Sequence, residues 1–426
     1  MTILVWLTAL LMGIGQNLPF DSLYPMGVSP ADIALLAMSV LVLADAATRA
    51  EFMAEANRLR QLFMLAFALS TLTAVSCLSN AFTWDMQGND LVEMLRPFYY
   101  FLLVVFVSVH TRRHGLGVLT AFLTGILVSG VVSYLRPTSE DVLGFVMLWN
   151  PNVIGNMLAV GILFASLLIF DGRLVRASVF MLICLVLSIF TYSKGTWLMA
   201  LAGLLACLIA MRASSGTAGA RLGRWILGLS LLGLVALVAR NFDALYDLVA
   251  FKLFTTQLGD TAAEGGTAAA RWGFVEVSFQ LALEHPLLGI GISNFESVYR
   301  TLERPLGNAY WVTDNPHSAW LYILACMGIP ALLVFFAIFV QTLRTLAVRV
   351  PLQGLARQIY IGLFFLVLFL SGAVMLQLLT QYFFWFFAGV VHGWQPRSAA
   401  APATAPSRLG AGAVWTGRDV RTGAAA

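Results

Sequence analysis

Charged residues are scarce in this sequence, and lysine is almost missing. Of 426 residues, 11% are charged and 60% are hydrophobic, and Lys194 and Lys252 are the two lysines. Soluble globular domains carry about 25% charged residues, so this composition excludes a soluble globule. The formal net charge of +4 is too small and too dispersed to indicate nucleic-acid binding. The composition is typical of a polytopic membrane protein.

Metal-binding patterns are missing as well. The four cysteines lie in or beside apolar runs and lack the spacing of a metal site. We expect buried small hydrophobic residues rather than disulfides or metal ligands. No Asp-x-Asp or His-x-x-x-His pattern occurs near the outer face assigned below, so we expect neither a metal nor another cofactor. The cysteines are Cys77, Cys184, Cys207 and Cys326.

Long apolar runs predict an all-α, polytopic helical protein. A bilayer core requires about 17 to 25 mostly apolar residues per helix, and counting such runs gives about twelve spans. The first fifteen residues have no basic region and no cleavage pattern, so we expect a first span rather than a signal peptide. The spans are expected near 2–18, 30–48, 60–79, 96–110, 115–135, 152–170, 174–192, 195–211, 224–240, 318–341, 357–375 and 376–392.

Basic residues predict the orientation, because Lys and Arg favour cytoplasmic loops. With the N-terminus inside, 17 of the 25 basic residues fall on one face, whereas most acidic residues fall on the other. We therefore expect both termini to be cytoplasmic. The expected organisation is 1–240 with nine spans, 241–317 as an extracytoplasmic loop, 318–392 with three spans, and 393–426 as a disordered cytoplasmic tail. The basic residues expected inside are Arg49, Arg58, Arg60, Arg112, Arg113, Arg173, Arg176, Arg212, Arg221, Arg224, Arg344, Arg349, Arg357, Arg397, Arg408, Arg418 and Arg421.

Two polar motifs lie at the outer ends of apolar spans. Lys194 is in the hairpin sequence TYSKGTW, and an ionisable group at membrane depth indicates function by default; an interfacial anchor is the alternative. Asn150-Pro151-Asn152, with Asn156 one turn later, places amides at a helix start. These amides either cap the helix or bind sugar hydroxyls, and the sequence favours neither.

The outer loop contains a second set of motifs. Residues 271–286 have helical spacing with one apolar stripe, so we expect a helix along the membrane surface or over a cavity, ended by His285-Pro286. Gly289 and Gly291 then allow a close backbone approach to a ligand or a packed helix. The sequence Asp314-Asn315-Pro316-His317 opens the tenth span.

The order of these motifs resembles the bacterial O-antigen ligase and O-antigen polymerase superfamily. The resemblance rests on Arg271-Trp272, His285-Pro286-Leu287 with Gly289 and Gly291, Asn294-Phe295, and His317 with Leu321 and Gly328. TYSKGTW looks like that family's short Ser-Arg motif, and the Asn-Pro-Asn motif looks like another recurrent element. Three positions depart from the family: Lys194 replaces the usual arginine, Ser318 a common asparagine and Cys326 a frequent glutamate.

The resemblance implies a GT-C-like membrane glycosyltransferase in the bacterial inner membrane, with its active site facing the periplasm. The donor would be a glycan on undecaprenyl pyrophosphate, and the acceptor a sugar hydroxyl on lipid A core or on a growing polysaccharide. His317 would be the general base. Lys194 and Arg271 would bind the pyrophosphate. Secondary sugar-binding or loop-shaping candidates are Asn152, Asn156, His285, Gly289, Gly291 and Asn315.

Several alternatives stay open at this point. An O-antigen ligase is the first hypothesis, and a repeat-unit polymerase of a surface or exopolysaccharide is the second. His317 could instead be a histidine at a helix start that orients the loop. A polysaccharide or lipid transporter would bury charges in mid-span and have two similar halves, and the sequence has neither pattern.

Overall fold

The protein is a helical bundle. The computed structural model describes residues 2–14, 30–80, 88–135, 151–189, 191, 194–213, 225, 228, 267–292, 294–301, 318–374 and 382–396. None of these residues lies in a β-strand, and nearly all are helical, which confirms the all-α prediction. The helices with described bounds are α1 (Thr2–Ile14), α2 (Pro30–Ala44), α3 (Ala46–Arg58), α4 (Arg60–Asn80), α5 (Gly88–His114), α6 (Gly117–Leu135), α7 (Pro151–Phe170), α8 (Leu174–Ile189), α9 (Lys194–Ala213), α12 (Thr267–Glu284), α13 (Phe295–Thr301), α14 (Ala319–Arg349), α15 (Gly354–Val374) and α17 (Tyr382–Gly393).

The chain is a multi-pass membrane protein. Within the described ranges, six helices are long and apolar enough to cross a bilayer, or seven if α2 and α3 form one broken span. Shorter apolar helices coincide with four further predicted spans, at α1, α6, α8 and α17. Of the predicted span 224–240, Trp225 and Gly228 alone are described. The count of twelve therefore stays a prediction.

The chain bends sharply where the sequence indicated one straight span followed by a loop. Helix α2 ends at Ala44, and α3 begins at Ala46 after a bend of 111°. The cause is Asp45, whose carboxylate accepts a hydrogen bond from the backbone N–H of Thr48 at 2.9 Å. A side chain that caps free N–H groups in this way starts a new helix. Residues 49–58, which lie between the predicted spans 30–48 and 60–79, are therefore helical.

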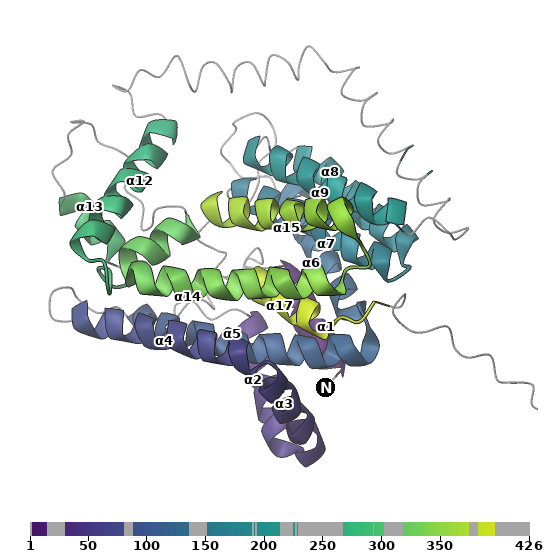
Figure 1. Cartoon of the computed structure of the whole chain (residues 1–426), viewed down its shortest axis with the longest axis horizontal. Coiled ribbons are helices and arrows are strands. Elements are labelled where there is room, and N and C mark those ends of the chain that lie inside the picture. The colour runs from purple at the N-terminus through teal and green to yellow at the C-terminus, as the bar shows by residue number, and fades with distance from the viewer. Residues whose placement is uncertain are drawn as a thin grey trace, which may run out of the picture.

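Helices α4, α5 and α14 run side by side across the molecule, with α12 and α13 gathered at one end of it (Figure 1). Helix α5 contains Pro97, which has no N–H and interrupts the helical hydrogen bonds. The backbone N–H of Phe98 instead donates to Ser70 Oγ of α4 at 2.9 Å. A side chain of the neighbouring helix therefore satisfies a group that the proline leaves open.

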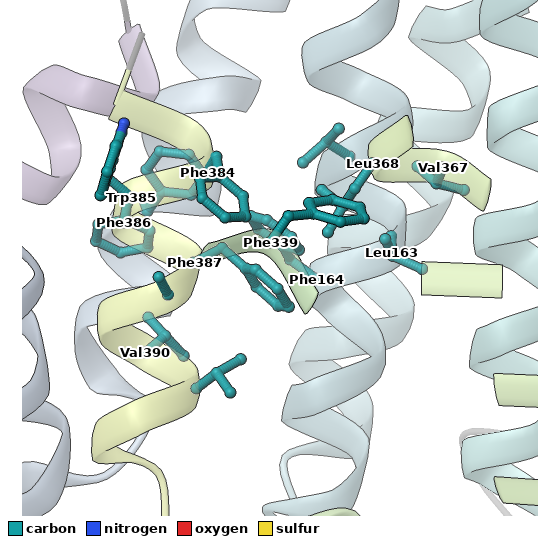
Figure 2. Packing of buried hydrophobic residues seen from close by; sticks show 14 of the residues in the cluster. Leu163, Phe164, Phe339, Val367, Leu368, Phe384, Trp385, Phe386, Phe387 and Val390 are labelled. Atoms are coloured by element: carbon teal, nitrogen blue, oxygen red, sulfur yellow. The ribbon is translucent and has the colours of Figure 1, made fainter. Parts of the chain in front are cut away.

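The centre of the bundle is filled by α7 and by the aromatic residues of α17. Every residue in the apolar window of α7 is buried, and residues 384–387 of α17 are buried as well. Figure 2 shows these aromatic rings among side chains from other helices. Phe387 stacks on Phe164 with ring centroids 4.8 Å apart, and Phe386 stacks on Phe122 at 4.3 Å. These buried rings therefore pack the interior of the bundle.

Glycines bring α1 and α6 into backbone contact. A Cβ atom added to Gly13 would lie 2.1 Å from the carbonyl oxygen of Phe122, and one added to Gly125 would lie 2.2 Å from that of Leu10. Lipid chains are as apolar as the helices, so membrane helices associate largely through close packing, and small residues permit it. The contact at Gly13 and Gly125 therefore fixes α1 against α6.

Replacing Gly125 with alanine is expected to destabilise the protein by about 1 to 3 kcal/mol, because the added methyl group overpacks this contact. The matched control is Gly362→Ala in α15, where an added Cβ meets nothing within 4 Å. This control should be neutral or slightly stabilising, since alanine favours helix more than glycine does. Thermal unfolding of the purified protein in detergent measures both. A melting temperature of Gly125→Ala at or above that of the wild type would contradict the expectation.

Candidate functional site

Three of the sequence motifs converge where α7, α9, α14 and α15 meet. We call this region the helix-start cluster, because the N-terminal ends of α7, α9 and α14 lie in it. Its described members come from all four helices and are mostly small or polar. They are Gly155, Asn156, Thr196, Ser318, Ser371 and Gly372.

The starts of α7 and α9 touch at a glycine. A Cβ atom added to Gly155 of α7 would lie 2.1 Å from Thr196 Oγ1 of α9. The missing side chain therefore lets α9 approach α7 two residues after Lys194, the first residue of α9. Trp197 Nε1 of α9 donates to the carbonyl of Ser188 in α8 at 3.2 Å. Thr191 and Thr196 of the TYSKGTW motif thus lie against α7 three residues after Asn152.

Helix α15 connects this contact to the start of α14. Asn156 Nδ2 of α7 donates to Ser371 Oγ at 2.8 Å in a buried environment. Ser318 caps the N-terminus of α14, and its hydroxyl donates to the carbonyl of Gly372 at 3.4 Å. Trp320 Nε1 also donates to the carbonyl of Phe369 at 3.0 Å. No sequence pattern distinguishes Ser371 or Gly372, yet they join two predicted motifs.

The structure describes some of the predicted site residues and not others. His317 and Asn315 lie outside the described residues, although His317 directly precedes Ser318 in the sequence. The backbones of Lys194, Arg271 and Asn152 are helical, in α9, α12 and α7, and their side chains lie outside the described part of the structure. The assigned roles of all five residues stay predictions.

The predicted loop helix is present as α12. It ends at Glu284, directly before His285 and Pro286, as the sequence indicated. Its apolar stripe is exposed: Phe279 and Leu283 are 54% and 82% accessible, and Leu287 beyond the helix is 69% accessible. Exposed apolar side chains at this spacing are typical of a helix that lies on a membrane surface.

A second feature, which we call the kink junction, joins residues 286–291 to a break in α14. Gly328 has non-helical angles (φ 83°, ψ 175°), and Pro330 follows it. The break leaves backbone groups of α14 without helical partners. They bond across to the loop: Ile290 N–H donates to the carbonyl of Ala325 at 3.0 Å, and Ile329 N–H donates to that of Pro286 at 2.9 Å. Gly291 N–H likewise donates to the Cys326 carbonyl at 2.9 Å.

Two glycines make the kink junction sterically possible. A Cβ atom added to Gly289 would lie 2.4 Å from the carbonyl carbon of Cys326, and one added to Gly328 would lie 2.6 Å from that of Leu287. Both have positive φ angles, which side chains disfavour. The close backbone approach expected at Gly289 is therefore to α14. His285 contributes through its backbone carbonyl, which accepts from Gly289 N–H at 2.9 Å, while its side chain is exposed.

Helix α4 supplies two side chains that sequence reasoning missed. The buried hydroxyl of Ser76 contacts the carbonyl of Leu288 and lies 2.8 Å from that of Cys326. Asn80 Nδ2 donates to the carbonyl of Gly289 at 3.2 Å. The available signal was the presence of polar residues in an otherwise apolar helix. Their partners lie more than 200 positions away along the chain, so the sequence alone could not identify them.

The helix-start cluster and the kink junction both involve α14. Seven residues separate Ser318 from Ala325, a distance of about 10 Å along a helix axis. The kink junction therefore fixes the end of α12 about two turns from the start of α14. Among the described residues, no group of three His, Cys, Asp or Glu side chains is close enough to hold a metal ion. Metal independence stays a prediction.

Residues 177–336 match a family model described as O-antigen ligase. The matched segment contains most of α8, all of α9, α12 and α13, and the first part of α14. It also includes Lys194, Arg271 and His317. No curated protein matches the chain. The match confirms the resemblance to the O-antigen ligase and polymerase superfamily and supports an enzyme of that general type.

Replacing Ser76 with alanine is expected to destabilise the protein by about 1 to 3 kcal/mol, because the buried hydrogen bond from its hydroxyl to the kink junction is lost. The matched control is Ser79→Ala, one turn away on the exposed side of α4, which should change stability by less than about 0.5 kcal/mol. Thermal unfolding measures both variants, and limited proteolysis between α12 and α14 reports opening of the junction. Equal effects of the two substitutions would contradict the role assigned to Ser76.

Proposed function

We propose that this chain is a membrane glycosyltransferase that transfers a glycan from undecaprenyl pyrophosphate to an acceptor sugar hydroxyl, as an O-antigen ligase acting on lipid A core. The observation that carries the proposal is the O-antigen ligase match over residues 177–336. This region contains the proposed base and both proposed phosphate-binding cations. A lipid-linked donor also fits a chain with several membrane-spanning helices.

The proposed reaction is a direct displacement at the anomeric carbon. His317 removes the proton of the acceptor hydroxyl while its oxygen attacks that carbon. The bond from the anomeric carbon to the pyrophosphate oxygen breaks, and the electron pair stays on the departing pyrophosphate. The products are the new glycosidic bond, undecaprenyl pyrophosphate and a proton on His317. A single displacement of this kind inverts the anomeric configuration.

Lys194 and Arg271 are proposed to stabilise the departing pyrophosphate. Fixed cations are worth most where negative charge develops in a site that excludes water. Lysine supplies a charge but not the two parallel hydrogen bonds of arginine. Lys194 would therefore act as a point charge, and Arg271 would supply the bidentate contact.

The arrangement of the described residues supports the proposal that Lys194 and His317 act at one site. The helix-start cluster brings the beginning of α9, where Lys194 lies, toward the beginning of α14, next to His317 in sequence. The chain of contacts runs through Asn156 and Ser371, both buried. Secondary roles in sugar binding or loop shaping are proposed for Asn152, Asn156, His285, Gly289, Gly291 and Asn315.

The exposed apolar stripe of α12 supports a site at the membrane surface. Phe279, Leu283 and Leu287 would rest in the interface. The isoprenoid chain of the donor would then stay in the bilayer while its pyrophosphate reaches the site. We propose that this face is periplasmic, because the basic residues favour the opposite side.

His317→Ala is expected to lower the transfer rate by about 10²- to 10⁴-fold, the usual contribution of a general base, with membrane insertion and melting temperature unchanged. Glycan transfer by purified protein from an undecaprenyl pyrophosphate donor measures the rate. The matched control is His114→Ala, an exposed histidine at the end of α5, which should retain full activity. Normal transfer by His317→Ala would refute the assignment of the base.

Ligase and polymerase share the donor chemistry and differ in the acceptor. Deleting the coding sequence should leave lipid A core without attached polymer if the protein is a ligase. Attachment of single repeat units only would instead identify a polymerase. Gel separation of the extracted lipopolysaccharide distinguishes these outcomes. Unchanged lipopolysaccharide and exopolysaccharide would count against both.

A further inference from the structure

A cluster of arginines, which we call the arginine cluster, lies on the face that the basic residues predict to be cytoplasmic. In this predicted topology the helix-start cluster is on the opposite face. The arginine cluster joins α3, α5, α14 and α17, four helices that are distant along the chain. Its members are Glu55, Arg58, Ser108, Arg112, Arg349 and His392.

Glu55 is the acidic member of the cluster and is 3% exposed. Arg58 Nε lies 2.9 Å from its carboxylate, and Arg112 Nη2 lies 3.0 Å from it. Ser108 Oγ donates to the same carboxylate at 2.5 Å. Buried carboxylates are tolerated when they are paired and hydrogen-bonded in this way. Glu55 is therefore fully satisfied within the cluster.

Positive charge exceeds negative charge at this position. Arg349 adds a third guanidinium to those of Arg58 and Arg112, and it interacts electrostatically with both of them and with Glu55. Among the described residues of the cluster, three positive charges against one negative charge leave a surplus of +2. The neighbouring Arg113 is paired with Glu51 and does not offset the surplus. Like charges held together in a partly buried site are costly unless an anion balances them.

Unused hydrogen-bonding groups border the same cluster. Within the part of the chain that the structure describes, Thr111 Oγ1, His392 Nε2 and Trp394 Nε1 are buried and have no hydrogen-bond partner. His392 interacts electrostatically with Arg349, Arg58 and Glu55. Thr111 contacts Gly393, between His392 and Trp394. Buried polar groups are normally paired, so these groups are able to form hydrogen bonds to a bound ligand.

The cluster can be reached from outside the protein. The side chains of Arg58 and Arg112 are 34% and 37% exposed. Arg58 Nη2 also donates to the carbonyl of His392 at 2.6 Å, and Arg349 donates to that of Trp394, so both guanidiniums are held in place by the end of α17. Fixed, partly exposed guanidiniums match the oxygen geometry of a phosphate group.

We propose that the arginine cluster is a binding site for a phosphate-bearing anion. Anionic phospholipid headgroups in the cytoplasmic leaflet and free inorganic phosphate share this chemistry. Basic sites between membrane helices on the cytoplasmic side are known to hold anionic headgroups. The bound anion would balance the surplus charge and join α3, α5, α14 and α17. This site is independent of the proposed glycosyl transfer.

The test is stabilisation of the delipidated, full-length protein by defined additives. Melting temperature is followed during titration with phosphatidylglycerol, with phosphatidylcholine, and with inorganic phosphate. A rise with phosphatidylglycerol alone supports the proposal and identifies a lipid. A rise with inorganic phosphate as well supports it and identifies free phosphate as a sufficient ligand. No rise with either anion would overturn it.

Substitutions distinguish an anion-binding site from a group of residues that only holds the four helices together. Arg112→Gln should shift half-maximal stabilisation to roughly tenfold higher concentration, the loss expected for one charged hydrogen bond. The control Arg344→Gln removes the same charge from an exposed position of α14 outside the cluster and should have no effect on the titration. Glu55→Gln removes the competing carboxylate and should shift half-maximal stabilisation to lower concentration. Identical titrations for Arg112→Gln and Arg344→Gln, or a loss of response in Glu55→Gln, would overturn the proposal.

Discussion

The hydrogen-bonding needs of the backbone at the break in α14 are the constraint on which the rest of the candidate site depends. In a membrane protein no water is available to satisfy an open carbonyl or N–H group, so irregular backbone persists only where other protein groups bond to it. Residues 286–291 supply those partners at Ala325, Cys326 and Ile329. Residues 286–291 and the break in α14 therefore depend on each other, because each supplies hydrogen-bond partners for the backbone of the other.

This dependence explains how distant motifs come to share one region. Helix α14 is held at the break by the loop and by Ser76, and at its start by the cap at Ser318. The same cap contacts α15, which also holds Asn156. Helices that precede and follow the outer loop are thereby fixed relative to each other. A transferase that must align a lipid-linked donor and a separate acceptor requires such fixed geometry.

Most of the helices could be predicted from the sequence, because long apolar runs specify spans directly. The boundary at His285 was also predictable, since proline ends a helix. Other features depend on partners far away in the chain. The bend at Asp45 results from the helix cap that Asp45 forms, which starts a new helix within the apolar run predicted as the span 30–48. Ser76 and Ser371 are unremarkable serines in sequence, and only their contacts with Cys326 and Asn156 distinguish them. The assigned base and cations came from family resemblance and could not come from periodicity.

The position of α17 has a consequence for biosynthesis. This helix is the last described one in the chain, yet its aromatic residues fill the middle of the bundle between α5, α7 and α14. The rings of Phe164 and Phe339 therefore lack their contacts with Phe387 and Phe384 until residues 384–387 have left the ribosome. The aromatic centre of the bundle is therefore completed only after α17 has been synthesised.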